Sequence, residues 1–68
     1  MEIRTYHGKI VKTKVGQSVV NEYYKGFLND VYVFNTREMA DACKERKTLA
    51  DSYMMQSNYH WRIQTIKE

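Results

Sequence analysis

The stretch Ser18–Leu28, with the sequence SVVNEYYKGFL, decides the fold of this chain. Its apolar residues recur at intervals that suit an amphipathic helix of about three turns. Its residue types suit a strand instead, because valine, tyrosine and phenylalanine favour sheets and Gly26 disfavours a helix interior. We therefore expect a strand over residues 18–28, with a helix as the alternative.

The residues that follow this stretch predict a second strand and then a helix. Val31–Phe34 is a run of β-branched and aromatic residues, and the pair Asn29–Asp30 before it suits a two-residue hairpin loop. Asn35 or Thr36 then begins a helix, with Glu38 placed as in a capping box. A hairpin joined directly to a helix is therefore expected in the middle of the chain.

The predicted helix has an apolar side that we expect to pack on the sheet. At about 100° per residue, its members share one arc. They are Met39, Ala42, Cys43, Leu49, Ala50, Tyr53 and Met54. Arg46 points near the middle of the same arc. Either one helix carries an inward arginine, or two helices meet near Lys47, because Thr48–Asp51 resembles a second capping box.

Both ends of the chain have the pattern of strands. β-branched residues dominate the N-terminal end, and Gly8 interrupts them where a bulge is expected, so we expect a long strand over residues 2–14. Tyr59–Thr65 alternates polar and apolar residues, which predicts a closing strand. The predicted fold is α+β, a small antiparallel sheet with one face covered by a helix, in the order β-β-β-α-β. If residues 18–28 were helical, the order would be β-α-β-α-β.

Length and composition indicate one small soluble domain over residues 1–68. The chain has 68 residues, of which 43% are hydrophobic and 28% charged, and it contains no proline that would suggest a linker. The first residues lack a secretory signal pattern, so we expect a cytoplasmic protein. A core of this size contributes about 3 to 5 kcal/mol of net stability. Association with a partner protein, or as a homodimer, therefore stays open.

The sequence offers no set of residues for catalysis. His7 and His60 each follow a tyrosine, and with Cys43 they are candidates for a metal site, but no two of them have the spacing of ligands on one helix. The three glycines are too far apart for a phosphate-binding loop. We therefore expect no enzyme, no metal site and no cofactor, with Cys43 as an inert core thiol.

Aromatic residues are more numerous than a core of this size needs. Nine of the 68 residues are aromatic, and six of these are tyrosine. Tyrosine, tryptophan, methionine and arginine are enriched in protein interfaces. The candidate partner-binding residues are Tyr23, Tyr24, Arg46, Met55 and Trp61.

The N-terminal strand carries a basic stripe, opposed only by Glu2. Its members are Arg4, Lys9, Lys12 and Lys14. Such a stripe can follow a phosphate backbone while nearby aromatic rings stack on bases. Lysines also protect an edge strand against aggregation, and the net charge of +3 is too small to decide between these two interpretations.

In length and amino-acid composition the chain is similar to small accessory proteins of tailed bacteriophages, which are short, proline-free and rich in Tyr, Lys and Asn. The segments that carry this resemblance are Asn21–Lys25, Asn29–Phe34 and Ser57–Trp61. The resemblance implies a stoichiometric anti-defence or host-takeover protein that inhibits or redirects a host protein. It does not extend to acidic DNA mimicry, because this chain has a charge of +3. The prediction is a non-enzymatic protein-binding module, with a nucleic-acid-binding domain as the alternative.

Overall fold

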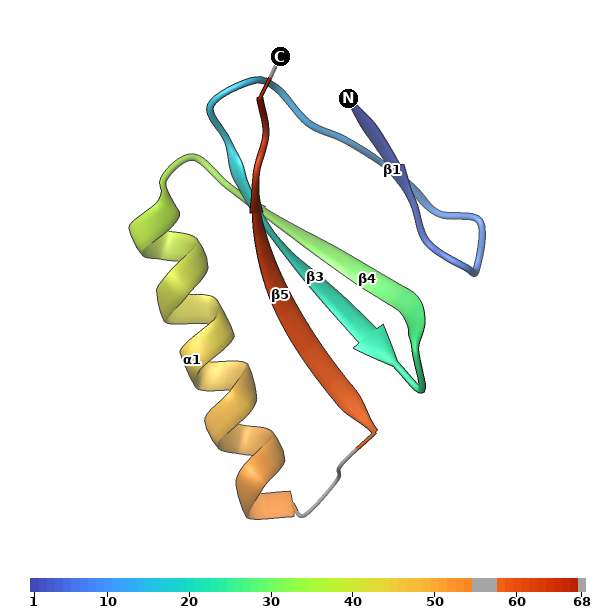
Figure 1. The fold of residues 1–68 in the computed structure, drawn as a ribbon, viewed down its shortest axis with the longest axis vertical. Helices are drawn as coiled ribbons and strands as arrows, with labels where there is room; N and C mark the ends of the chain where they lie inside the picture. Colours follow the sequence, from blue (N-terminus) through green and yellow to red (C-terminus); the bar gives the residue numbers. More distant parts are fainter. Residues whose placement is uncertain (55–57, 68) are drawn as a thin grey trace.

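A computed structural model describes residues 1–54 and 58–67 (Figure 1). Its elements follow one another as β1 (Glu2–Arg4), β2 (Ile10–Lys12), β3 (Ser18–Tyr24), β4 (Phe27–Phe34), α1 (Arg37–Met54) and β5 (Tyr59–Thr65). Strands β4, β3 and β5 form an antiparallel sheet in that order, and β1 and β2 form a separate hairpin. The predicted α+β class is confirmed, with an antiparallel sheet packed against one helix.

Residues 18–24 form strand β3, as their residue types predict, but the expected strand over residues 18–28 is too long because the chain turns inside it. Tyr24 pairs with Phe27, so the hairpin loop is Lys25–Gly26, and both residues have positive φ, 51° and 86°. Positive φ at both positions is what a twisted two-residue hairpin loop requires. The predicted loop at Asn29–Asp30 is wrong, because the register shifts there and these residues lie at a β-bulge inside β4.

The long N-terminal strand predicted over residues 2–14 is also wrong. The chain reverses between β1 and β2, which pair antiparallel with Ile3 opposite Val11. Gly8 has a φ of 91°, and its N–H donates to the carbonyl of Thr5. A residue with this φ turns the backbone back on itself, so Gly8 makes a turn where the sequence suggested a bulge within one strand.

Two small clusters of apolar side chains form the core, one on each face of the sheet. On the hairpin side, the buried members are Ile3, Val19, Val31 and Ile66. On the helix side, the buried members are Val20, Ala40 and Cys43, with Tyr32, Phe34, Trp61 and Ile63 packed against them. Successive residues of β3 alternate between the two clusters. One face of the sheet is therefore covered by α1, and the β1–β2 hairpin packs on part of the other face.

Helix α1 is unbroken from Arg37 to Met54, and it is capped by Thr36, whose Oγ1 accepts a hydrogen bond from the N–H of Met39 at 3.2 Å. Thr36 is one of the two predicted starting residues. The alternative of two helices meeting near Lys47 is wrong. In the described part of the chain, no helix is long and apolar enough to cross a membrane.

Among the side chains that the structure describes, the side of α1 that packs on the sheet shares only Cys43 with the predicted apolar arc. Ala40 and Cys43 are buried, whereas Met39, Leu49 and Tyr53 are 53%, 55% and 80% exposed. Small residues suit the inner side because bulky side chains of the sheet already fill the space beneath the helix. Ala42, Arg46 and Ala50 are exposed as well, so the arginine does not point inward. The side chain of Met54 lies outside the described residues.

Candidate functional site

A groove of about 460 Å³ lies between α1 and β5. Its lining residues are Lys44, Thr48 and Asp51 from the helix and Tyr59, His60, Trp61 and Arg62 from the strand. The helix packs more on β5 than on the central strand β3, so it runs alongside the sheet's outer strand (Figure 1). The groove therefore follows the outer edge of β5.

The two edges of the sheet differ in how far they are covered. At the β4 edge, the β1–β2 hairpin makes contact, because the N–H of Tyr6 donates to the carbonyl of Leu28 and Lys9 pairs with Asp30 at 3.2 Å. At the other edge, β5 pairs with β3 alone among residues 1–54 and 58–67. An edge strand presents unpaired backbone N–H and C=O groups to solvent. The outer edge of β5 therefore offers backbone hydrogen-bonding groups beside the groove.

Three aromatic rings form a row on the helix side of the sheet, next to the groove. The ring centroids of Tyr24 and Tyr59 are 4.8 Å apart, and those of Tyr59 and Trp61 are 5.8 Å apart with nearly parallel planes. All three residues are half-buried. Tyr59 and Trp61 therefore give the groove an apolar wall of two nearly parallel rings.

A buried carboxylate holds the Trp61 end of this row in place. Glu22 is 7% exposed, and its Oε1 accepts a hydrogen bond from the indole Nε1 of Trp61 at 3.1 Å. The Nδ2 of Asn29 donates to the other oxygen at 2.9 Å, and the hydroxyl of Tyr32 lies 3.5 Å from Oε1. The carboxylate on β3 thus has donors from both neighbouring strands, β4 and β5, which compensates for its burial.

Lys47 extends this network to the helix. Its Nζ donates to the Tyr32 hydroxyl at 3.3 Å and lies 4.7 Å from the centroid of that ring. Burial raises the pKa of the Tyr32 phenol, although the hydrogen bond from Lys47 opposes this effect. The same hydrogen bond raises the pKa of the Lys47 ammonium, against the effect of its own burial. A chain of donors therefore runs from Lys47 through Tyr32 to Glu22.

The groove is more basic than acidic. Lys44, His60 and Arg62 are exposed on its walls, and Asp51 is its acidic member. Within residues 1–54 and 58–67, neither Lys44 nor Arg62 forms an ion pair. Side chains with this balance of charge suit a negatively charged ligand.

The structure separates the residues predicted to bind a partner. Tyr24 and Trp61 belong to the aromatic row, but Tyr23 faces the opposite side of the sheet, in a second recess with His60 and Arg62. Arg46 lies exposed on the outer side of α1. Met55 lies outside the described residues. The predicted set is therefore not a single site among the residues that the structure places.

Sequence reasoning missed Glu22, Tyr32 and Lys47. One signal was present for Glu22, because in a strand it must share a face with Val20 and Tyr24, which places a carboxylate on an apolar face. No comparable signal marks Tyr32 or Lys47, whose contact depends on how α1 lies across β4.

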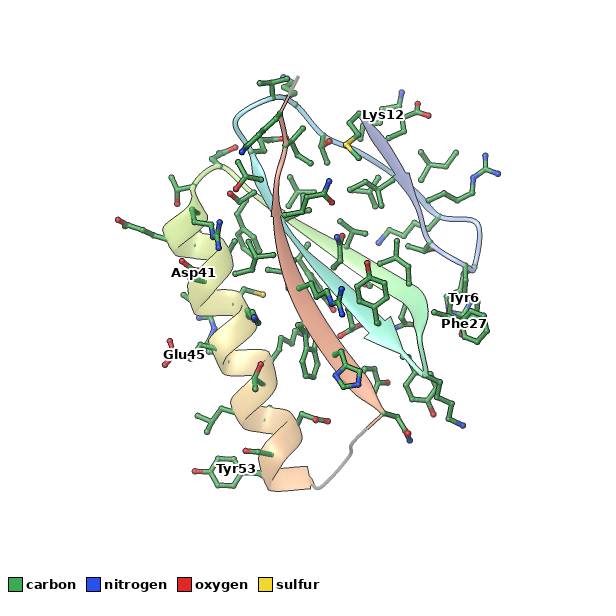
Figure 2. All side chains as sticks on the ribbon, in the orientation of Figure 1. Tyr6, Lys12, Phe27, Asp41, Glu45 and Tyr53 are labelled. Atoms are coloured by element: carbon green, nitrogen blue, oxygen red, sulfur yellow. The ribbon has the colours of Figure 1, made fainter. Side chains whose placement is uncertain are left out.

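The basic stripe lies on the β1–β2 hairpin and the residues just after it, and all four of its members are exposed. It is interrupted by acidic neighbours, because Lys12 lies opposite Glu2 in the strand register and Lys9 pairs with Asp30. Beside the turn of the hairpin, the rings of Tyr6 and Phe27 are in contact (Figure 2), with centroids 5.6 Å apart and exposures of 52% and 61%.

The candidate metal ligands do not converge. His7 hydrogen-bonds Asn29 of β4 through Nε2 at 3.1 Å, whereas His60 lies on β5, at the other side of the sheet's central strand. Cys43 is buried under the helix. In the part of the chain that the structure describes, no group of three residues is arranged to hold a metal ion.

Comparison of the chain with family models, with curated proteins and with solved structures finds no match. The function is therefore inferred from the geometry of the molecule.

Proposed function

We propose that this protein is a non-enzymatic binding module that takes an extended segment of a partner protein as an additional strand on β5. The observation that carries this proposal is the free outer edge of β5, among the described residues, beside a groove of about 460 Å³. Strand addition to an exposed sheet edge is a common mode of peptide recognition, in which backbone hydrogen bonds provide affinity and pockets for alternate side chains provide specificity.

The length of β5 sets the size of the segment. β5 has seven residues, so at about 3.3 Å per residue it offers an edge of roughly 23 Å. A partner segment of about six or seven residues fits this edge. Its backbone groups would pair with those of β5, which themselves have no strand partner on that side within residues 1–54 and 58–67.

The walls of the groove define which side chains the segment should carry. Successive side chains of a strand point to opposite faces. On the helix side they would meet the aromatic ring of Tyr59 or Trp61, and on the other side they would meet His60 and Arg62. We therefore expect apolar residues to alternate with acidic residues in the bound segment.

The resulting mode of action is stoichiometric binding. A module that occupies an extended segment of another protein inhibits or modulates it without chemistry of its own. This agrees with the function that the sequence resemblance implies.

Intrinsic fluorescence tests the proposal directly, because Trp61 is the only tryptophan and lines the groove. The probe is a set of seven-residue peptides in which aromatic or aliphatic residues alternate with glutamate. We expect saturable changes in Trp61 emission, together with slowed amide exchange along β5. Peptides with lysine in place of glutamate should bind at least about tenfold more weakly, which corresponds to about 1.4 kcal/mol.

Two charge reversals separate binding in the groove from attraction to the whole protein. Arg62→Glu alters the groove, whereas Lys14→Glu makes the same change in charge on an exposed part of the N-terminal segment. We expect Arg62→Glu to weaken peptide binding and Lys14→Glu to leave it almost unchanged. Equal effects of the two variants, or protection of β4 amides in place of β5 amides, would contradict strand addition at this edge.

Nucleic-acid binding is the second candidate, favoured by the exposed Tyr6–Phe27 ring pair beside the basic hairpin. A fluorescent single-stranded oligonucleotide tests it. Each phosphate contact should contribute about 0.7 to the slope of log affinity against log salt concentration. Tyr6→Ala and Lys12→Ala should each weaken binding. Binding that is absent at low salt, or that is unaffected by both variants, would exclude this candidate.

A further inference from the structure

The outer side of α1 carries a row of exposed residues that the fold itself does not use. We call this row the outer seam, and its members are Met39, Ala42, Arg46, Leu49 and Tyr53. Figure 2 shows Tyr53 projecting from α1 on the side away from the sheet. Four of its five members are apolar, and exposed apolar residues that gather on one side of a helix indicate a contact surface, although single ones are common.

The spacing within the outer seam is that of a helix that packs against another helix. Its residues follow at intervals of three and four along the chain, which is the a and d pattern of a heptad repeat. The inner side of the same helix is already occupied, because Ala40 and Cys43 pack on the sheet. Helix α1 therefore has one apolar side for its own sheet and a second apolar side available for another helix.

We propose that the outer seam pairs with the outer seam of a second copy of this chain, with the two α1 helices antiparallel. The order of side-chain sizes along the seam points to this occupant. A twofold axis between Lys47 and Thr48 sets Tyr53, the largest member, opposite Ala42 of the second copy, which is the smallest. The same axis sets Arg46 opposite Leu49 of the second copy. Such a surface is complementary to itself, as a twofold interface requires.

Charge supports the antiparallel arrangement. Glu45 precedes Arg46 in the chain and lies on the flank of the outer seam, and both residues are exposed. In a parallel pair, the two copies of Arg46 would face each other and repel. In the antiparallel pair, the stem of Arg46 lies along Leu49 of the other copy. Its long side chain then brings the guanidinium within reach of Glu45 of that copy, and the twofold axis repeats this ion pair.

The size of the interface predicts a weak, concentration-dependent dimer. A helix of 18 residues is about 27 Å long, so a two-helix contact falls at the small end of specific protein interfaces. The groove beside β5 stays open in this dimer, because Lys44 and Thr48 lie on a different side of α1 from the outer seam. The dimer would present two grooves, so it goes beyond the proposed function without depending on it.

Sedimentation equilibrium of the full chain over roughly 1 µM to 1 mM tests the proposal. We expect the average mass to rise from 8.2 kDa toward twice that value as the concentration increases. Arg46→Glu should weaken association at least about tenfold, because it puts a second carboxylate near Glu45 of the other copy. The double variant Glu45→Arg with Arg46→Glu reverses both charges and should restore association to within about threefold of the original.

Two further variants keep the result interpretable. Lys44→Glu makes the same change in charge on the groove side of α1 and should leave the mass distribution unchanged. Leu49→Ser removes an apolar member of the outer seam without altering charge and should also weaken association. A mass of 8.2 kDa at the highest concentration would overturn the proposal. Association that survives both Arg46→Glu and Leu49→Ser would overturn it as well, because the copies would then meet through another surface.

Discussion

On most surface helices the larger apolar residues face the core, whereas on α1 small residues face the core and larger apolar residues are exposed. The inner side packs on the sheet through Ala40 and Cys43 and also carries the half-buried Lys47. The outer side exposes larger apolar residues, such as Leu49 and Tyr53. The difference shows that the packing side of a helix depends on the volume that the opposing surface supplies. Here the sheet supplies large rings, so small helix residues complete the core.

The largest expected effect concerns the polar network beneath the inner side. Glu22→Ala leaves the Trp61 indole, the Asn29 amide and the Tyr32 hydroxyl without their shared acceptor. Because buried donors without partners are costly, we expect a loss of about 3 kcal/mol in the free energy of unfolding, measured by urea titration. Glu22→Gln keeps an acceptor oxygen and should cost clearly less. If both variants unfold at the same urea concentration, the network does not stabilise the inner side.

The same substitution, alanine to leucine, should have different effects on the inner and outer sides of α1. Ala40 is fully buried and Ala42 is exposed, although they lie two residues apart. Ala40→Leu overfills the inner core and should reduce the free energy of unfolding by about 2 kcal/mol. Ala42→Leu should change it by less than about 0.5 kcal/mol, as is usual for a surface position. Thermal melts at low protein concentration measure both effects, and the reverse order would mean that the inner and outer sides are wrongly assigned.

A smaller loss of stability is expected from removing the N-terminal cap of α1. Thr36 accepts the hydrogen bond from the N–H of Met39, so Thr36→Ala should cost about 1 kcal/mol. The side chain of Asn35 instead accepts a hydrogen bond from Gln17, both on the surface. Asn35→Ala is therefore the matched control and should cost less. A larger loss for Asn35→Ala in chemical denaturation would show that Asn35 caps the helix.

The smallest expected effect is a loss of stability that sets in only at alkaline pH. The pKa values of Tyr32 and Lys47 are both raised, so the folded protein holds these two protons more tightly than the unfolded chain. Their contribution to stability is present below about pH 10 and is lost as the pH rises through the raised values. Urea titrations between about pH 8 and pH 11 should show this decline, and Tyr32→Phe should reduce it. Stability that increases over this range would contradict the assigned contacts.

Much of the fold could be predicted because local residue types agree with it. The valines and tyrosines of Ser18–Tyr24 prefer a strand, and the helix over Arg37–Met54 follows from its composition and cap. The turns were harder to predict. Asn29–Asp30 and Lys25–Gly26 both suit a hairpin loop, and which pair turns depends on the register that β3 finds with β4.

The candidate site could be predicted only in part, because it depends on where distant elements come to lie. Trp61 and Tyr24 were identified from residue type alone, since such residues are frequent in interfaces. The groove requires β5 to occupy an edge and α1 to lie along it, which no local pattern encodes. Ala40 on the inner side of α1 was missed for a related reason, because the larger residues Met39, Leu49 and Tyr53 placed the predicted apolar arc on another side of the helix.

Because Cys43 is buried beneath α1, its thiol can report when the helix separates from the sheet. Cys43 is the only cysteine of the chain, and it is 7% exposed beneath α1, in the same cluster as Val20. An alkylating reagent can reach this thiol only when the helix lifts from the sheet or the chain unfolds. When opening is rare and rapidly reversed, the rate of labelling equals the opening constant multiplied by the reactivity of a free thiol. The alkylation rate of the unmodified protein therefore measures the fraction of molecules in which this thiol is exposed.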